Sequence, residues 1–307
     1  MKVAITGASG FIGSGLSAYL RSIPEVSVML ELGRVSNNWD AEPYSEGGWS
    51  KVLEQVDVVY HLGGNTDIEW AEKNPKKSLD QAIIPIDNLL SAVEKISKKV
   101  RFIFVSTATI YGAETIDKTC ELDFPNPCTV YDLHKSYVES YIHLASMRGN
   151  FKAISLRLSN VYGPSLVRNK NVNRGILNQM IAKALAGDVL KLYAGYDLRR
   201  DYLFIDDLYR ALFQCANSIK FEPGAYNLSS GNSFSMEQVL SVIRQVVFNE
   251  IGMQPKIESV PFPDGMNKIH YRNYSAEIKK FKEGFNWAPK VSLEDGIVRT
   301  IKSILNK

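Results

Sequence analysis

The sequence predicts an α/β protein built around a doubly wound parallel sheet, with a smaller interleaved lobe toward its C-terminal end. Three observations support this fold class. Apolar, β-branched runs alternate with segments of helical spacing through the first half of the chain, a glycine-rich turn follows the first run, and a later run ends in two hydroxyl residues. Such alternation is typical of a parallel sheet covered by helices on both faces, and right-handed crossovers then restrict its topology.

Five short apolar runs in the first half predict the strands of this sheet. They span residues 2–6, 26–32, 56–62, 101–106 and 152–158. Three segments between them carry apolar residues three and four positions apart, which is the spacing of an amphipathic helix. They span residues 12–21, 86–96 and 130–147.

The pattern changes after Gly163-Pro164. Helices are predicted over residues 175–186, 236–248 and 293–305, short strands over 226–228 and 256–260, and a strand-to-helix return over 204–216. We therefore expect a sheet domain of residues 1–164, to which residues 197–216 return. Residues 165–196 and 217–307 form the second lobe in this division.

The composition is that of an ordinary globular protein. Of the 307 residues, 45% are hydrophobic and 22% charged, which is too apolar for a disordered chain. The 36 basic and 33 acidic side chains leave a net charge of +3, and no basic stripe is present, so we expect no nucleic-acid partner. No apolar run approaches the roughly 20 residues that cross a bilayer, so we expect no membrane partner.

The expected location is the cytoplasm. The cysteines Cys120, Cys128 and Cys215 are odd in number and lack metal-ligand spacing, which indicates free thiols in a reducing compartment and no metal site. The first residues already read as a strand and a turn, which leaves no room for a signal peptide.

A glycine-rich turn between the first strand and the first helix predicts a phosphate-binding site. Gly7 permits the sharp turn, Gly10 lets backbone N–H groups approach a pyrophosphate, and Gly13 allows close packing of helix on sheet. The helix N-terminus adds partial positive charge and unpaired donors. Phe11 and Ile12, between the last two glycines, are assigned to the same site. The sheet domain would then hold a dinucleotide, and the second lobe a substrate.

The end of the second strand bears on which dinucleotide binds. Glu31 is placed to accept hydrogen bonds from the ribose hydroxyls of NAD. Arg34, three residues later, is placed to pair with the 2′-phosphate of NADP, unless it is only a surface charge of the loop. We expect NAD, with NADP as the alternative.

A tyrosine and a lysine predict a proton-transfer site. Tyr131 and Lys135 are four residues apart, so they share one face of the helix that begins near residue 130. A phenol has a reference pKa of about 10, and a nearby ammonium and a cationic nicotinamide both favour the phenolate. Ser106 and Thr107 end an apolar strand at the edge where a parallel sheet presents its ligand site. We expect Thr107 to hydrogen-bond the hydroxyl group that Tyr131 deprotonates, unless Ser106 and Thr107 only cap the strand.

These motifs together resemble the extended branch of the short-chain dehydrogenase/reductase superfamily, within the NAD-dependent epimerase/dehydratase family. The G-x-x-G-x-x-G turn, the Ser/Thr-Tyr-Lys set and the segment VSTATIYG are similar to those of UDP-galactose 4-epimerase and its relatives. The resemblance implies a Rossmann domain. It also implies that Thr107 is the hydroxyl member, Tyr131 the general base or acid, and Lys135 the group that anchors the ribose and tunes the phenol, with Ser106 beside them.

Further segments carry the resemblance over nearly the whole chain. The segment DVVYHLGG implies that Leu62, Gly63 and Gly64 line the nicotinamide side of the cofactor site. The segments LRLSNVYGP and RDYLFIDDL imply substrate-phosphate contacts by Asn160 and Arg200. A guanidinium also suits a diphosphate on chemical grounds, although a salt bridge from Arg200 to Asp201 or Asp206 is an alternative. Asn171, in the following polar loop, is a further candidate for the base or phosphate end of the substrate.

Several positions depart from the family pattern. Ala108-Thr109 stands where 4,6-dehydratases carry an Asp-Glu pair, which disfavours dehydration, and Ala82 stands where an asparagine is expected. The arginine that commonly clamps the second phosphate is missing near Pro263, where Lys268 or Arg272 could substitute.

The resemblance implies an enzyme that transfers hydride reversibly at a carbon, C4 by preference, of a nucleotide-diphosphate sugar. An NAD-dependent 4-epimerase is favoured, an NADPH-dependent 4-keto-deoxysugar reductase or a dehydrogenase is the alternative, and a non-catalytic dinucleotide sensor is the alternative of another class. The family's pairing of such helices implies a homodimer. The sugar, the nucleoside base and the stereochemistry stay open.

Overall fold

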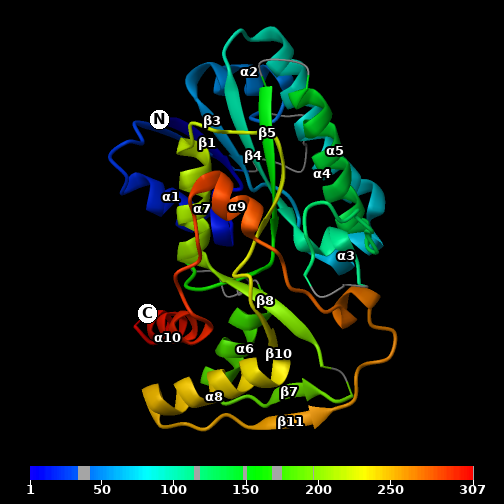
Figure 1. Ribbon diagram of the computed structural model, residues 1–307, viewed down its shortest axis with the longest axis vertical. Helices are drawn as coiled ribbons and strands as arrows, with labels where there is room; N and C mark the ends of the chain where they lie inside the picture. Colours follow the sequence, from blue (N-terminus) through cyan, green and yellow to red (C-terminus); the bar gives the residue numbers. More distant parts are fainter. Residues whose placement is uncertain (34–41, 114–117, 148–150, 168–174, 196, 307) are drawn as a thin grey trace.

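The computed structural model describes residues 1–33, 42–113, 118–147, 151–167, 175–195 and 197–306. These residues form one part built on a six-stranded sheet and a second part of short strands and helices (Figure 1). The N-terminus lies in the sheet part, and the C-terminal helix α10 (Leu293–Leu305) lies in the second part (Figure 1). The expected α/β class with a parallel sheet is confirmed.

The central sheet is parallel throughout and has the order β2-β1-β3-β4-β5-β9. In chain order its strands are β1 (Lys2–Thr6), β2 (Val28–Leu32), β3 (Val58–His61), β4 (Val100–Thr107), β5 (Phe151–Leu158) and β9 (Gly224–Leu228). The chain runs from β1 to β2 on one side and returns to β3 on the other, so the strand order reverses between β1 and β3. The carboxyl ends of strands at such a reversal form the usual ligand crevice of this fold.

Helices cover both faces of the sheet because both faces of its strands are apolar. On β1, Val3 and Ile5 belong to the core that contains α1 and α7, whereas Ala4 belongs to the core that contains α2, α4 and α5. Figure 1 shows the two sets on opposite sides of the sheet. The helices are α1 (Phe11–Arg21), α2 (Glu46–Gln55), α3 (Ile68–Lys73), α4 (Pro75–Lys95), α5 (Val130–Ser146) and α7 (Ile205–Asn217).

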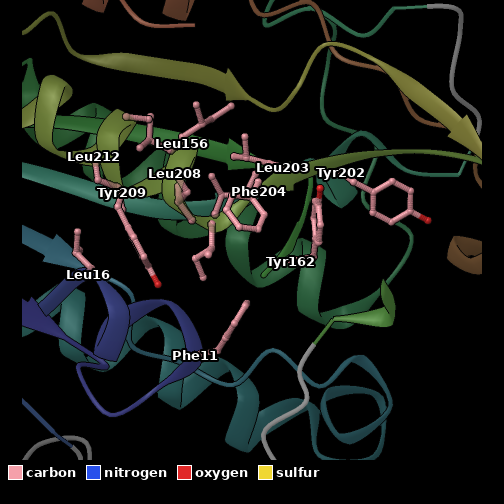
Figure 2. Packing of buried hydrophobic residues seen from close by; sticks show 14 of the residues in the cluster. Phe11, Leu16, Leu156, Tyr162, Tyr202, Leu203, Phe204, Leu208, Tyr209 and Leu212 are labelled. Atoms are coloured by element: carbon pink, nitrogen blue, oxygen red, sulfur yellow. The ribbon is translucent and has the colours of Figure 1, made fainter. Parts of the chain in front are cut away.

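The core on the α1 face continues into the second part. Figure 2 shows Phe11 and Leu16 of α1 near Leu208 and Tyr209 of α7. Phe204, Tyr162 and Tyr202 extend the same cluster toward the second part (Figure 2). One apolar core therefore joins the two parts.

The second part contains two small sheets. One has the order β10-β8-β6, and in the other β7 and β11 pair in parallel. Its elements are β6 (Asn160–Tyr162), α6 (Ile176–Leu185), β7 (Leu190–Tyr193), β8 (Arg199–Phe204), β10 (Ser233–Ser235), α8 (Met236–Ile251), β11 (Ile257–Val260) and α10. Helix α9 (Lys279–Phe285) lies beside α7 and β9 in the sheet part (Figure 1). The division at residues 164, 197 and 217 stays a prediction. In the structure, β8 lies in the second part, although the prediction returns residues 197–216 to the sheet domain. Strand β9 is the edge strand of the central sheet, although the prediction assigns residues 217–307 to the second lobe.

One helix differs from its expected extent. The spacing predicted a helix over residues 86–96, but α4 begins at Pro75. Proline suits the first turn of a helix, where its missing N–H is not needed. Pro85 lies inside α4, a position that usually breaks a helix. Its carbonyl accepts a hydrogen bond from Trp49 Nε1 at 2.8 Å, and burial of Trp49 against α4 helps to hold this turn in place. Among the described residues, no helix is both long and apolar enough to cross a membrane.

Candidate functional site

A cleft of about 590 Å³ opens at the carboxyl ends of the central strands. It lies where the strand order reverses, as expected for a dinucleotide site. Most of the predicted cofactor and catalytic residues line it. They are Gly7, Gly10, Phe11, Ile12, Gly13, Leu62, Gly63, Gly64, Ser106, Thr107, Tyr131 and Lys135.

The glycine turn holds the end of β1, the start of α1 and the loop after β3 in close contact. Gly7 has a φ of +66°, and a Cβ there would come within 2.9 Å of the backbone nitrogen of Gly63. A Cβ on Gly13 would lie 2.1 Å from the carbonyl oxygen of Gly7. Only glycine fits at these two positions. The close approach brings the first N–H groups of α1 to the cleft, where they can bind an anion.

Thr6 fixes the loop that follows β3. Its Oγ1 accepts hydrogen bonds from the N–H groups of Leu62 at 3.1 Å and Gly63 at 2.9 Å. Its hydroxyl lies 3.0 Å from His61 Nδ1. Burial lowers the pKa of His61 to about 3, and the nearby charge of Lys135 adds to that decrease. His61 is therefore a neutral, buried imidazole.

The structure brings Thr107, Tyr131 and Lys135 together at the cleft. Thr107 ends β4, and the other two lie on the first turns of α5, which Thr129 caps by accepting a hydrogen bond from the backbone of Asp132. Lys135 Nζ donates to the carbonyl of Val105 at 2.9 Å. Burial lowers the pKa of Lys135 to about 8, while Glu139 acts in the opposite direction. A lysine that is easily deprotonated can take part in proton transfer near neutral pH.

The phenol of Tyr131 is less acidic in the protein than an ordinary tyrosine, whereas the sequence predicts a lowered pKa. Burial raises its pKa well above the ordinary value, and the neighbouring carboxylate of Asp132 adds to the increase. A hydrogen bond with Thr107 acts in the opposite direction. Lys135 Nζ lies 5.9 Å from the centre of the Tyr131 ring. The phenolate therefore needs a positive charge beyond that of Lys135, and a cationic nicotinamide ring would provide one.

Further residues line the cleft that sequence reasoning missed. Ser9, Asn65 and Thr66 follow the carboxyl ends of β1 and β3, so their position after these strands could have indicated them. Gln81 on α4 also lines the cleft, next to Ala82 where the family asparagine was expected. Nothing in the local spacing marked Gln81, because α4 reaches the cleft only through its packing beside α5.

The cleft residues fit a dinucleotide. The N-terminus of α1 faces the cleft and the two tight glycines exclude side chains from it, which suits a pyrophosphate. The buried Oγ of Ser106 has no hydrogen-bond partner within the described part of the chain, so it is available to a ligand. In this arrangement the glycine turn would hold the phosphates, and Lys135 the ribose next to the nicotinamide.

Glu31 lies on β2, as the sequence predicts, but outside the lining of the cleft. Its carboxylate pairs with Arg21 of α1 at 2.5 Å, and Glu31 is not among the residues that line the cleft. The residue occupies the expected strand position, but its side chain extends along α1. Contact with a ribose would require this exposed pair to open. Arg34 and Asn171 lie outside the described residues.

Two arginines lie together in the second part. Arg200 on β8 is buried, and its guanidinium donates to the carbonyls of Arg199 at 3.0 Å and His270 at 2.8 Å. Burial lowers the pKa of Arg200 to about 9, and the charge of Arg272 lowers it further. Neither arginine forms a salt bridge with another described residue, so the alternative of an Arg200 pair with Asp201 or Asp206 is not observed. Arg200 therefore has no carboxylate partner among the described residues, whereas the charge of Asp132 acts on Arg272. A buried guanidinium without a carboxylate partner is suited to an anionic ligand.

Asn160 lies near this pair through the β6–β8 ladder. It is opposite Tyr202, and its amide donates to the carbonyl of Asp201 at 3.0 Å. Asn160 and Arg200 do not line the cleft of the glycine turn, so they belong to a separate region of the site. Within the described part of the chain, no group of three or more His, Cys, Asp or Glu side chains could hold a metal ion.

A phosphate-binding turn and a Thr-Tyr-Lys set at the reversal point of a parallel sheet define the class of dinucleotide-dependent oxidoreductases. Comparison with known families agrees. The model of the NAD dependent epimerase/dehydratase family matches residues 3–229, and the chain belongs to this family. It is thus an enzyme of an NAD-dependent family, which confirms the expected enzyme class and cofactor.

Individual relatives differ in their activities. The chain is 25% identical to UDP-glucuronic acid decarboxylase 2 of Arabidopsis thaliana, over 98% of this chain and 68% of that protein. It is 27% identical to dTDP-4-dehydro-6-deoxyglucose reductase of Escherichia coli, over 98% of this chain and 97% of that protein. The structure of UDP-glucuronic acid 4-epimerase from Bacillus cereus, with UDP-glucuronic acid and NAD, superposes with a TM-score of 0.83 at 23% identity, over 100% and 99% of the two chains. The similarity to this last structure shows that the two chains share a fold.

Proposed function

We propose that the protein is an NAD-dependent nucleotide-sugar 4-epimerase. The observation that carries this proposal is that Thr107, Tyr131 and Lys135 line the same cleft as the glycine turn. A binding module would need the turn but not a Tyr-Lys pair beside it in the cleft. The non-catalytic sensor is therefore the weaker alternative.

The proton chemistry falls to Tyr131 and Thr107. Tyr131 takes the proton of a sugar hydroxyl, and Thr107 hydrogen-bonds the same oxygen. Lys135 holds positive charge beside the phenol. When bound in the cleft, NAD would supply the hydride acceptor for the carbinol carbon and, once reduced, the hydride donor. A keto sugar that rotates within the site would receive hydride on its other face. After Tyr131 returns the proton, this sugar would leave as the 4-epimer.

The nucleotide end of the substrate is assigned to the second part of the chain. Arg200 and Arg272 would hold the diphosphate, with Asn160 beside them. Their mutual repulsion is relieved when an anion binds between them, because the anion stabilises both charged guanidinium groups. Arg272 replaces the arginine that the sequence lacks near Pro263. Asn171 stays a candidate for the same end of the substrate.

A second candidate is a 4-keto reductase that uses NADPH. Two observations favour it: the raised pKa of Tyr131 suits a phenol that donates a proton to a ketone, and a related reductase covers nearly the full chain. Reduction needs Tyr131 protonated at the start, whereas epimerisation needs it ionised. The two functions therefore differ in the resting state of one phenol.

The test is to supply the purified enzyme with UDP-glucose or UDP-glucuronic acid and NAD. Proton NMR should show a 4-epimer while nicotinamide absorbance stays constant. Consumption of NADPH with a dTDP-4-keto-6-deoxy sugar, and no epimer, would instead establish the reductase. If the enzyme binds the cofactor but produces no 4-epimer and consumes no NADPH, both enzyme proposals fail for these sugars.

A homodimer and a cytoplasmic location complete the proposal. Tyr137 and Leu144 on α5 are exposed to 47% and 44%, which is unusual for such side chains on a helix that also packs on the sheet. A second copy of the chain could cover them. Light scattering of the purified protein, compared with a Leu144→Glu variant, tests this arrangement.

A further inference from the structure

Tyr44 reaches the glycine turn from a segment to which the proposed function assigns no role. The backbone carbonyl of Leu32, the last residue of β2, accepts a hydrogen bond from the Gly7 N–H at 3.0 Å. The Tyr44 hydroxyl donates to the same carbonyl at 3.3 Å. A carbonyl oxygen has two lone pairs, so it can accept both bonds. The Tyr44 hydroxyl therefore lies beside the turn that is expected to hold a pyrophosphate.

The surroundings of Tyr44 hold its ring in a fixed position. Tyr44 directly precedes Ser45, the N-cap of α2, and its carbonyl accepts a hydrogen bond from Asn88 Nδ2 of α4 at 3.1 Å. Its ring meets the ring of Trp49 edge-on, with the two ring centres 6.0 Å apart. Only 4% of Tyr44 is exposed, and the residue lines the cleft. The part that this packing leaves uncovered is thus a rigid piece of the cleft wall.

The order of the strands places Tyr44 on the side of the turn that faces away from the catalytic residues. The glycine turn follows β1, which lies between β2 and β3. Thr107, Tyr131 and Lys135 lie on β4 and α5, beyond β3. Tyr44 is bonded to the end of β2, on the opposite side. Of the described residues of β2, of α2 and of the turn before α2, Tyr44 is the one that lines the cleft.

A dinucleotide extends to both sides of its pyrophosphate. The proposed function places the nicotinamide half beside Tyr131 and Lys135. With the phosphates at the turn, the adenosine half must then extend over β2. Adenine is a flat aromatic base, and aromatic rings pack favourably in offset or edge-to-face arrangements. The Tyr44 hydroxyl gives its single hydrogen to Leu32, so the ring is the part of Tyr44 that suits such a base.

We propose that Tyr44 is a cofactor-binding residue whose ring packs against the adenine of NAD. The inference rests on the proposed function for the position of the nicotinamide half. It deepens that function by assigning a residue to the adenosine end of the cleft, which Glu31 does not line. The bond to Leu32 ties this wall to the glycine turn, so the adenine and pyrophosphate positions keep a fixed separation.

Two substitutions separate the ring from the hydroxyl group. Tyr44→Phe and Tyr44→Leu both remove the hydroxyl, and only Tyr44→Phe keeps the aromatic ring. The probe is ADP-ribose, which carries the adenosine half of NAD and both phosphates. It should bind Tyr44→Leu about 3- to 10-fold more weakly than the parent, the size of one aromatic contact, and Tyr44→Phe within about 2-fold of the parent.

Calorimetric titration of ADP-ribose into the full chain gives these affinities. Nicotinamide mononucleotide, which carries the other half of the cofactor, is titrated by ligand-detected NMR and should bind the parent and both variants equally. A merely structural role of Tyr44 would weaken both fragments together. Thermal melting confirms that each variant is folded. If Tyr44→Leu does not fold, Tyr44→Met takes its place, because it also lacks a ring.

Three results would overturn the proposal. In the first, ADP-ribose binds Tyr44→Leu as tightly as the parent; in the second, Tyr44→Phe and Tyr44→Leu lose affinity equally; in the third, nicotinamide mononucleotide is weakened along with ADP-ribose. None of them involves a sugar substrate, so they are distinct from a failure of the proposed epimerase reaction. A parent protein that binds neither fragment would contradict the dinucleotide site itself, and the role of Tyr44 with it.

Discussion

Arg157 and Glu139 form a buried ion pair that joins β5 to α5. Arg157 Nη2 lies 2.8 Å from Glu139 Oε2, and the side chains are only 7% and 8% exposed. Arg157 Nη1 also donates to the hydroxyl of Tyr111 at 2.8 Å. The pair connects the strand beside β4 with the helix that carries Tyr131 and Lys135, so it supports the frame of the active site.

Removing one member of this pair should be strongly destabilising. Glu139→Gln leaves the Arg157 charge buried without its partner, and the free energy of unfolding should fall by about 3–5 kcal/mol. Urea denaturation measures the change. The double variant Glu139→Leu/Arg157→Met removes both charges and should be closer in stability to the parent than either single variant. A double variant that loses the sum of the two single effects would contradict the coupling.

Tyr131→Phe should abolish most activity without loss of cofactor binding. The phenol transfers a proton, and loss of such a group typically costs about 10²–10⁴-fold in rate. The variant removes one oxygen from the cleft and leaves the glycine turn intact, so NAD titration by calorimetry should give a dissociation constant close to that of the parent. The matched control is Tyr137→Phe, because Tyr137 is exposed on the same helix. Equal activity of both variants would exclude Tyr131 as the acid–base group.

Gly13→Ala should prevent dinucleotide binding. The new methyl group would lie 2.1 Å from the carbonyl oxygen of Gly7, so the turn must open at the point where the pyrophosphate is expected. We expect NAD affinity to fall by at least about 10-fold, the equivalent of one lost hydrogen bond to a charged group. Gly47→Ala is the control, since a Cβ there meets nothing within 4 Å and Gly47 lies in α2. Parent-like NAD affinity in Gly13→Ala would refute the assigned turn.

Asp201 should make the protein less stable as the pH rises from about 4 to 6. Burial raises the pKa of Asp201 to about 6, although hydrogen bonds from Ser230 act in the opposite direction. A carboxyl group whose pKa is higher in the folded than in the unfolded state binds its proton more tightly when folded. Its stabilising contribution is complete below the unfolded pKa and is lost as the pH rises through the folded pKa.

The size of this loss is about 3 kcal/mol, from a difference of roughly two pKa units. Asp201→Asn does not titrate, so its free energy of unfolding should change less over this range. The measurement is urea denaturation of both proteins at several pH values, and the difference between the two curves isolates Asp201 from the other titrating groups. A constant difference from pH 4 to 7 would contradict the prediction.

Much of the sheet could be predicted from the sequence because its signals are local. Buried parallel strands are continuous apolar runs, and the bounds of β1, Lys2–Thr6, agree with the predicted run. The start of α5 at Val130 likewise follows from a threonine cap and helical spacing. The beginning of α4 could not be predicted, because an internal proline is tolerated only through contacts with residues distant in sequence, such as Trp49.

The sequence by itself determined the glycine turn, the spacing of Tyr131 and Lys135, and thereby the class of chemistry, since these depend on residues close together in the chain. Tertiary structure alone decided the pairing of Glu31 with Arg21, the meeting of Arg200 and Arg272, and the hydrogen bond from Thr109 to Asp132. The physical reason is that charge interactions and hydrogen bonds depend on distance and burial. Both quantities are set by which elements pack together, and no local spacing contains them.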